Sequence, residues 1–232
     1  VREQIARRVT QLFYYDAVGA PIRHGEREFY TRKHKDKEKT VAYWKDARGE
    51  HVLFDPNTWG EDKSLHGWWP TYDGTRVAFA ISEHNSDETV MHVIDVATGK
   101  DLSDVIEGTK YAAASWTPDG HGFYYTWVPP VGAVPIAARP GYAELRFHKL
   151  GSDPAKDPVV HEATKNPETF LGGGVSRDGH WLIASIQHGW SSSDLYFRDA
   201  RKQGPWQVLV EGVPANFDAT VWRDHFYVTT ND

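Results

Sequence analysis

Apolar and polar positions alternate in short runs over most of the chain. Beyond the amino-terminal region, aromatic and β-branched segments are broken by Gly, Asp and Pro, which is the pattern of β-strands joined by tight turns. Only the start differs, because Ile5, Val9, Leu12 and Phe13 recur at helical spacing with Arg and Gln between them. The pattern predicts one short amphipathic helix over residues 1–13, which docks on a neighbour, followed by an all-β chain.

One stretch shows the plan of this all-β region most clearly. Residues 110–127 read KYAAASWTPDGHGFYYTW, with small residues, a Trp, an Asp-Gly pair and then an aromatic run. Asp-Gly between two strand-like runs is a strong hairpin signal, since glycine tolerates the positive φ that tight turns require. We therefore expect residues 112–116 to turn back at Asp119-Gly120 and pair with residues 122–127.

The same hairpin plan recurs along the chain. Its turns lie at residues 24–25, 73–74, 119–120, 178–179 and 223–224, so that 49 residues separate Gly25 from Gly74 and 46 separate Gly74 from Gly120. The first four hairpins are each followed by a second one with a Val-rich returning strand. Four strands in a repeat of about 45 to 50 residues are the signature of a β-propeller blade.

The repeat predicts a partial β-propeller with about four four-stranded blades and the start of a fifth. Residues 1–16 form the docking helix and lead-in. Residues 17–232 form the propeller, with blades at about 17–66, 67–110, 111–171 and 172–216 and the start of the next at 217–232. The longer third repeat places its extra residues in a protruding loop between the second and third strands. A complete four-bladed ring is the competing interpretation, but it leaves the fifth hairpin over.

Several repeated side chains are expected to serve packing and turns. The tryptophans at 68, 69, 116, 181 and 222 recur with the blades, which indicates packing between blades. Asp73, Asp119 and Asp178 are expected to hold the backbone of their own turns. His92, His148 and His161 are expected to lie half-buried along strands, and no metal-binding His motif occurs among the twelve histidines.

The amino-acid composition favours a β-protein and argues against nucleic-acid binding and cysteine chemistry. Ten Trp, eleven Tyr and ten Phe against one Met favour strands over helices. The net charge is -6 and residues of both signs are interspersed, so no coherent basic face is expected. This argues against a nucleic-acid partner. The absence of cysteine excludes thiolate metal sites and a cysteine nucleophile. We predict no cofactor and no metal. We also predict no membrane partner, since no apolar run is long enough to span a bilayer. The predicted location is cytoplasmic, with a periplasmic one as the alternative.

Several motifs, taken together and in order, carry a family resemblance. They are HKDKEKT at 34–40, FDPN at 54–57, HVID at 92–95, DVIEG at 104–108, WTPDG at 116–120, GFYY at 122–125, RPGY at 139–142 and SRDG at 176–179. This order resembles the amino-terminal half of a bacterial prolyl oligopeptidase, a serine peptidase of the prolyl endopeptidase type. The resemblance implies a parent with a seven-bladed propeller inserted in an α/β-hydrolase peptidase that cuts short peptides after proline.

The resemblance also implies a contribution to substrate binding. Matching the motifs places three pocket residues of the family on Tyr111, Leu171 and Trp190. Without the resemblance, Tyr111 and Leu171 are better explained as core or channel-lining residues, and the resemblance makes the binding role an equal alternative. The partners that it implies are the α/β-hydrolase domain of the parent chain and short proline-containing peptides.

The catalytic residues of the family are not expected in these residues. Its serine nucleophile lies in a Gly-x-Ser-x-Gly elbow, and residues 189–193, GWSSS, lack the second glycine and are predicted to form a turn. We therefore expect a propeller fragment that gates and selects substrates, without a triad, and that is inactive alone because the catalytic domain is absent. The alternative functions are a stand-alone propeller used as a protein-interaction scaffold and, less well supported, a propeller glycosidase, which needs paired carboxylates facing inward.

Overall fold

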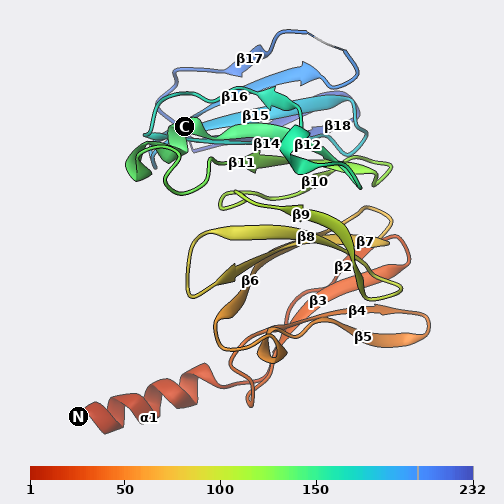
Figure 1. The fold of residues 1–232 in the computed structure, drawn as a ribbon, viewed down its shortest axis with the longest axis vertical. Coiled ribbons are helices and arrows are strands. Elements are labelled where there is room, and N and C mark those ends of the chain that lie inside the picture. Colours follow the sequence, from red (N-terminus) through yellow and green to blue (C-terminus); the bar gives the residue numbers. More distant parts are fainter. Residues whose placement is uncertain (203, 232) are drawn as a thin grey trace.

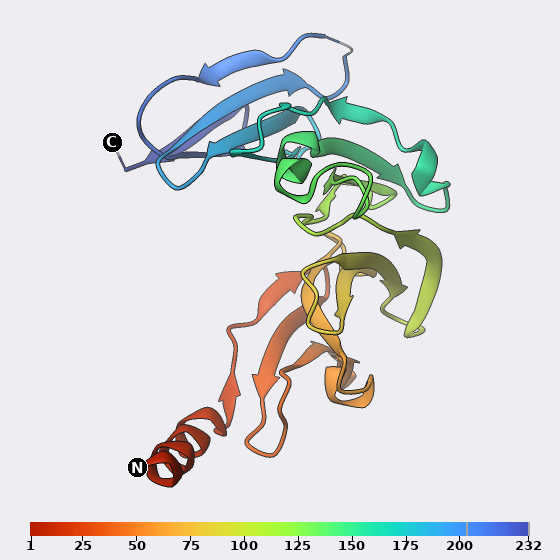
Figure 2. The ribbon, with the colours of Figure 1, turned by 60° about the vertical axis from the view of Figure 1, so that its left-hand side comes forward.

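The computed structural model describes residues 1–202 and 204–231, which form one helix and a series of antiparallel sheets. The helix α1 (Arg2–Phe13) leads into sheets that follow one another along an arc, as Figure 1 and Figure 2 show. The expected all-β partial propeller with one leading helix is confirmed. No helix among the described residues is long and apolar enough to cross a membrane.

The first sheet has a divided inner edge. Its strands are β1 (Ala17–Val18), β2 (Ile22–His24), β3 (Arg27–Lys33), β4 (Val41–Asp46) and β5 (Gly49–Phe54). The order is β1-β3-β4-β5, and β2 also pairs with β3. Thus two short segments, β1 and β2, share the innermost place that a single strand takes in the next sheets.

The next three sheets are four-stranded meanders in which each strand pairs with its neighbours in sequence. The second sheet contains β6 (Lys63–Pro70), β7 (Arg76–Glu83), β8 (Thr89–Asp95) and β9 (Lys100–Ile106). The third contains β10 (Ser115–Trp116), β11 (Gly122–Trp127), β12 (Glu144–Lys149) and β13 (Val159–His161). The fourth contains β14 (Thr169–Val175), β15 (Trp181–His188), β16 (Ser192–Asp199) and β17 (Gln207–Val210).

A two-stranded hairpin and three short 3-10 helices complete the described elements. The hairpin pairs β18 (Phe217–Trp222) with β19 (His225–Thr230). The 3-10 helices are η1 (Pro56–Thr58), η2 (Ile136–Tyr142) and η3 (Pro154–Lys156). The long segment between β11 and β12 contains η2, so the extra residues of the third repeat lie between the second and third strands, as expected.

The turns between first and second strands have the conformation that their Gly residues predict. Gly74, Gly120 and Gly179 have φ of 69°, 65° and 76°, a left-handed conformation that residues with a Cβ rarely adopt. In the turn of the second sheet, the Asp73 carboxylate accepts hydrogen bonds from the Thr75 amide and hydroxyl at 2.9 and 2.8 Å. The role of these aspartates in holding their own turns is therefore confirmed.

One expected strand is shorter than its sequence suggested. Only Ser115 and Trp116, of the predicted residues 112–116, pair with the second strand of the third sheet. The reason is a turn just before them, in which the Ala112 amide donates to the Thr109 carbonyl. The hydroxyl of Thr109 in turn donates to the Thr89 carbonyl at 2.9 Å, so this segment is fastened to the second sheet instead of continuing the strand.

Apolar clusters fill the spaces between successive sheets. Phe29 and Phe79 belong to the cluster between the first two sheets, Met91 and Phe123 to the next, and Leu145 to the one between the third and fourth. Apolar side chains from both sides therefore fill these three spaces, as they do between propeller blades.

The tryptophans that recur with the repeat, apart from Trp222, pack between successive sheets. The buried Trp116 indole donates to the Trp69 carbonyl at 2.8 Å, and the Trp181 ring packs edge-on against Phe226 at 5.6 Å. Trp222 is 53% exposed, and its place between blades stays a prediction. It lies on the last hairpin, whose outer face has no further sheet against it among the described residues.

Helix α1 extends away from the sheets (Figure 1). Its apolar residues Ile5, Val9 and Leu12 are 57–58% exposed, and none of the helix residues is buried. One contact with the first sheet places the Lys33 ammonium 4.0 Å from the centre of the Phe13 ring. The expected docking of this helix has no partner among the described residues.

Candidate functional site

The ends of the sheets form two rims of different kinds. The turn rim consists of the tight turns that join the first and second strands, at residues 25–26, 71–75, 117–121, 176–180 and 223–224. The loop rim, at the opposite end, consists of the loops that enter each first strand and those that join second to third strands. All three residues selected from the sequence belong to segments at or next to the loop rim.

Tyr111 lies in the loop between the second and third sheets and is 40% exposed. Its ring meets Phe170, at the start of β14, edge-on with 5.7 Å between the ring centres. Phe170 is itself 43% exposed, and the Lys110 ammonium lies 5.6 Å from the centre of the Tyr111 ring. Two accessible aromatic faces from different sheets thus form one corner, with a cation beside it.

Leu171 takes a different position from its neighbour in sequence. Its side chain is 4% exposed and packs in the cluster between the third and fourth sheets with Leu145 and Val128. Its carbonyl accepts a hydrogen bond from the Thr126 hydroxyl at 3.2 Å. The structure therefore brings Tyr111 together with Phe170, which the sequence reasoning missed, while the side chain of Leu171 serves the core. Strand alternation was the available signal, since it turns adjacent residues to opposite faces.

Trp190 is the most accessible of the three selected residues, at 94% exposed. It occupies the short turn between β15 and β16, and its carbonyl accepts a hydrogen bond from the Asn216 amide group at 3.2 Å. Across the described residues, its indole has no aromatic or cationic partner. It thus shares the loop rim with Tyr111 but does not join the Tyr111–Phe170 corner, and a role for all three in binding stays a prediction.

A partly buried ion pair holds the loops around Tyr111. The Arg139 guanidinium, whose side chain is 5% exposed, donates to both carboxylate oxygens of Glu88 at 2.6 and 2.8 Å. The hydrogen bonds from Arg139 keep the pKa of Glu88 below its ordinary value. Lys110 lies 3.8 Å from the same carboxylate. Because Arg139 belongs to the β11–β12 loop and Glu88 to the β7–β8 loop, the pair fixes two loops of the rim relative to each other.

A second polar group is sealed between the second and third sheets. His148 is completely buried, and its two ring nitrogens lie 2.9 Å from Asp104 and 3.0 Å from Asp157. Burial lowers the pKa of His148, but the hydrogen bonds to the two carboxylates outweigh burial and raise it. The expectation that His148 is half-buried is wrong, whereas it holds for His92 and His161. No substrate reaches this group, so its role is structural.

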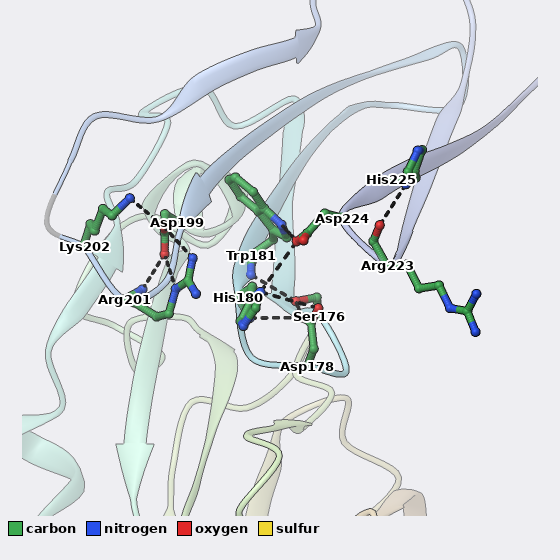
Figure 3. A network of polar contacts seen from close by, with 10 residues as sticks. All are labelled: Ser176, Asp178, His180, Trp181, Asp199, Arg201, Lys202, Arg223, Asp224 and His225. Atoms are coloured by element: carbon green, nitrogen blue, oxygen red, sulfur yellow. Dashed lines mark hydrogen bonds and ion pairs between the residues drawn. The ribbon is translucent and has the colours of Figure 1, made fainter.

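Acidic and histidine side chains also gather on the turn rim, as Figure 3 shows. Asp178, His180 and Asp224 offer ligand atoms within 4.8 Å of one another, although no metal is expected from the sequence. The oxygens have other partners, since Asp178 accepts from the Ser176 hydroxyl at 2.5 Å and Asp224 from the Trp181 indole at 3.0 Å. We assign this group to the junction of the fourth sheet and the last hairpin.

The serine-rich residues 189–193 form the expected turn and the start of β16. His188 pairs with Asp194 at 2.7 Å, while the Ser193 hydroxyl donates to the Phe217 carbonyl at 2.9 Å. In the ranges 1–202 and 204–231, no serine hydroxyl is hydrogen-bonded to a histidine ring nitrogen. The loop rim thus offers accessible aromatic surface for binding.

Comparisons with known proteins agree with the motif order. A family model described as "Prolyl oligopeptidase, N-terminal beta-propeller domain" matches residues 1–232. The prolyl endopeptidase of Elizabethkingia meningoseptica is 26% identical over 234 residues, which cover 99% of this chain and 33% of that protein. The dual function macrocyclase-peptidase POPB of Galerina marginata (strain CBS 339.88) is 30% identical over 202 residues, 78% of this chain and 27% of that protein.

A solved structure gives the same result for the fold. It comes from a study of two prolyl endopeptidases and the role of inter-domain dynamics in catalysis and specificity. It superposes with a TM-score of 0.94 at 46% identity, covering 100% of this chain and 35% of that one. The chain thus spans about a third of the length of the relatives that it matches.

Proposed function

This chain belongs to the prolyl oligopeptidase family, as an amino-terminal β-propeller domain, and from that premise we propose that it gates and selects substrates for a serine-type prolyl endopeptidase. The whole enzyme hydrolyses short peptides after proline. The propeller covers the active site and excludes folded proteins by size, while the nucleophile and its partners lie in an α/β-hydrolase domain outside these residues.

The Tyr111–Phe170 corner is the observation that carries this proposal. Accessible aromatic rings on a rigid frame bind apolar and proline-like groups through buried area and face contacts. The corner lies on the loop rim, where Arg139 and Glu88 fix the neighbouring loops. A catalytic domain placed over this rim would bring a bound peptide between Tyr111 and the scissile bond.

The proposal is tested with the full-length enzyme, using a short chromogenic peptide with an apolar residue before Gly-Pro. We expect Tyr111→Ala to lower kcat/KM about tenfold, which corresponds to about 1.4 kcal/mol of lost contact. Tyr15→Ala is the matched control, because Tyr15 is 52% exposed and also has a lysine over its ring, but lies near α1. The control variant should keep the wild-type kcat/KM.

Three results bear on the proposal. Turnover that a serine-directed phosphonate blocks, together with the loss in Tyr111→Ala, supports it. Equal kcat/KM for both tyrosine variants contradicts the part assigned to the rim. A full-length protein that cleaves no proline peptide contradicts the peptidase function and favours the alternative, a propeller that serves as a protein-interaction scaffold.

A further inference from the structure

A cavity of about 610 Å³ lies between the first two sheets, next to the loop rim. Its wall contains residues of β3 and β4, the end of the loop between them, Pro56 of η1 and residues 64–69 of β6. Pockets that bind small molecules have volumes of about 300–1,000 Å³. The cavity is therefore large enough for a ligand, and the Tyr111–Phe170 corner lies outside it.

Two irregularities in the strands lie on the wall of this cavity. The inner edge of the first sheet is divided, and beside the gap between β1 and β2 the Thr31 carbonyl accepts a hydrogen bond from the Gly19 amide at 2.8 Å. In β6 the register shifts between Leu65 and Gly67, which leaves His66 unpaired in a β-bulge. Bulges change the direction of a side chain and are frequent next to functional sites. Thr31 and His66 both line the cavity.

One side of the cavity is aromatic, because Trp68 and Trp69 both line it. The Trp69 ring lies across Gly67, where an added Cβ would come within 2.7 Å of ring carbon Cζ2. Nonbonded carbon atoms keep about 3.5–4.0 Å apart, so any larger residue at this position would displace the ring. The glycine thus lets the indole lie against β6, where it offers a surface for a planar or apolar group.

The polar side of the cavity carries positive charge and no carboxylate. Lys39 and His66 line it, whereas none of its lining residues is Asp or Glu. The Lys39 ammonium donates to the carbonyls of Gly60 and Lys63, each at 2.7 Å, and makes no ion pair within the described part of the chain. Because these acceptors are uncharged, the charge of Lys39 is not paired with a carboxylate and favours an anion in the cavity.

Free hydrogen-bonding groups surround the same charge. Among the described residues, the His66 ring makes no hydrogen bond and no ion pair. The lining hydroxyls also make no side-chain hydrogen bond to a described residue, and they are those of Thr31, Thr40 and Ser64. A single cation among neutral donors suits a carboxylate, which carries one charge and accepts several hydrogen bonds. A phosphate group carries more charge and has no apolar part for the aromatic side.

We propose that this cavity binds a small carboxylate whose aromatic or apolar part packs against Trp69. The carboxylate lies beside Lys39 and accepts hydrogen bonds from His66 and the lining hydroxyls. This binding site is additional to the proposed peptidase function and does not depend on it.

The test measures binding to the full-length protein by isothermal titration calorimetry, after treatment with a serine-directed phosphonate. Three probes separate the contributions, namely N-acetyl-phenylalanine, its uncharged amide and inorganic phosphate. We expect N-acetyl-phenylalanine to bind at least about tenfold more tightly than either of the others, because only it has both the charge and the ring. Equal affinity for the acid and its amide would overturn the anionic site. Equal affinity for the acid and phosphate would overturn the choice of a carboxylate.

Substitutions in the wall assign the binding to this cavity. His66→Ala should weaken the binding of N-acetyl-phenylalanine about threefold to tenfold, and Lys39→Met about tenfold or more. His66 is exposed and unpaired, so its removal leaves the fold intact, whereas Lys39→Met also removes hydrogen bonds to two carbonyls. A thermal midpoint close to that of wild type checks that each variant is folded.

Lys63→Met is the matched control, because the Lys63 ammonium is paired with Glu83 at 3.0 Å and Lys63 does not line the cavity. Lys63→Met and Tyr111→Ala should both keep the wild-type affinity. Wild-type affinity in both His66→Ala and Lys39→Met would overturn the site, and so would a loss confined to Tyr111→Ala. A protein that cleaves no proline peptide but shows the expected losses would contradict the proposed function alone and support this site.

Discussion

The buried Asp104–His148–Asp157 group gives the sharpest prediction about stability. His148 is completely buried, and the side chains of both aspartates are 2% exposed. Tyr125 donates a further hydrogen bond to Asp157 at 2.9 Å, and the Gly151 amide donates one to Asp104. Replacing His148 by Gln removes the cation and leaves two carboxylates sealed between the second and third sheets.

The expected cost follows from that burial. Removing one partner of a buried ion pair destabilises a protein by about 3–5 kcal/mol, because the remaining charge is neither solvated nor neutralised. His92→Gln is the control, since His92 is half-buried on β8 and its ring only stacks on Phe79 at 5.5 Å. Its cost should stay near 1 kcal/mol, which is typical of one aromatic contact.

The pH dependence gives an independent test with a definite sign. The pKa of His148 in the folded chain is raised above its ordinary value of 6.5, so the imidazolium stabilises the fold fully below about pH 6.5. This contribution is lost as the pH rises through the folded pKa. Burial and the Asp157 carboxylate also raise the pKa of Tyr125, which adds a further loss of stability above its ordinary value of 10.0. Arg146 opposes that shift.

Urea unfolding of the chain, followed by tryptophan fluorescence at several pH values, measures both effects. The difference in unfolding free energy between wild type and His148→Gln should be large at pH 6 and shrink as the pH rises. A difference that stays constant between pH 6 and pH 9, or grows with pH, would refute the reasoning. So would a cost for His148→Gln no larger than that for His92→Gln.

Three further predictions concern the loop rim and the spaces between sheets. Arg139→Met should destabilise the chain by about 1–3 kcal/mol because it removes two charged hydrogen bonds to Glu88, and limited proteolysis should then cut residues 128–143 first. Leu171→Ala should cost about 2–5 kcal/mol in urea unfolding because it opens a core cavity, whereas Phe170→Ala should cost little stability and lower kcat/KM of the full-length enzyme. Trp116→Phe should cost about 1–3 kcal/mol in the same unfolding assay, since it leaves the half-buried Trp69 carbonyl of the second sheet without its donor.

The local features of the fold were predictable because their causes are close together in the chain. An Asp-Gly turn needs only the carboxylate, the amides two residues on and the tolerance of glycine for positive φ. That is why the three Asp-Gly hairpins, at residues 73–74, 119–120 and 178–179, could be predicted from the residues alone. The shortened strand at Ser115 was missed because its cause, the hydrogen bond from Thr109 to Thr89, joins the loop after β9 to the start of β8.

The environment of His148 shows what a sequence pattern does not contain. Its partner Asp157 is nine residues away, but Asp104 lies 44 residues away on the outermost strand of another sheet. Alternation along β12 indicates which face a side chain takes, yet not which charged group the neighbouring sheet presents to that face. Half-burial was therefore the natural expectation for a strand histidine, and only the packing of two sheets shows the complete burial.

The same limit explains why the sequence pointed to Leu171, although the accessible side chain is that of its neighbour Phe170. Alternation turns these neighbours to opposite faces of β14, but both are apolar and the three glycines that follow give no contrast to show which face is buried. The third sheet decides the matter, because Leu145 and Val128 cover Leu171, while Phe170 stays accessible and contacts Tyr111 at the rim. In a propeller, then, the residue matched to a family pocket and the residue that is accessible can differ by one position. Single substitutions at both positions are needed to assign the contact.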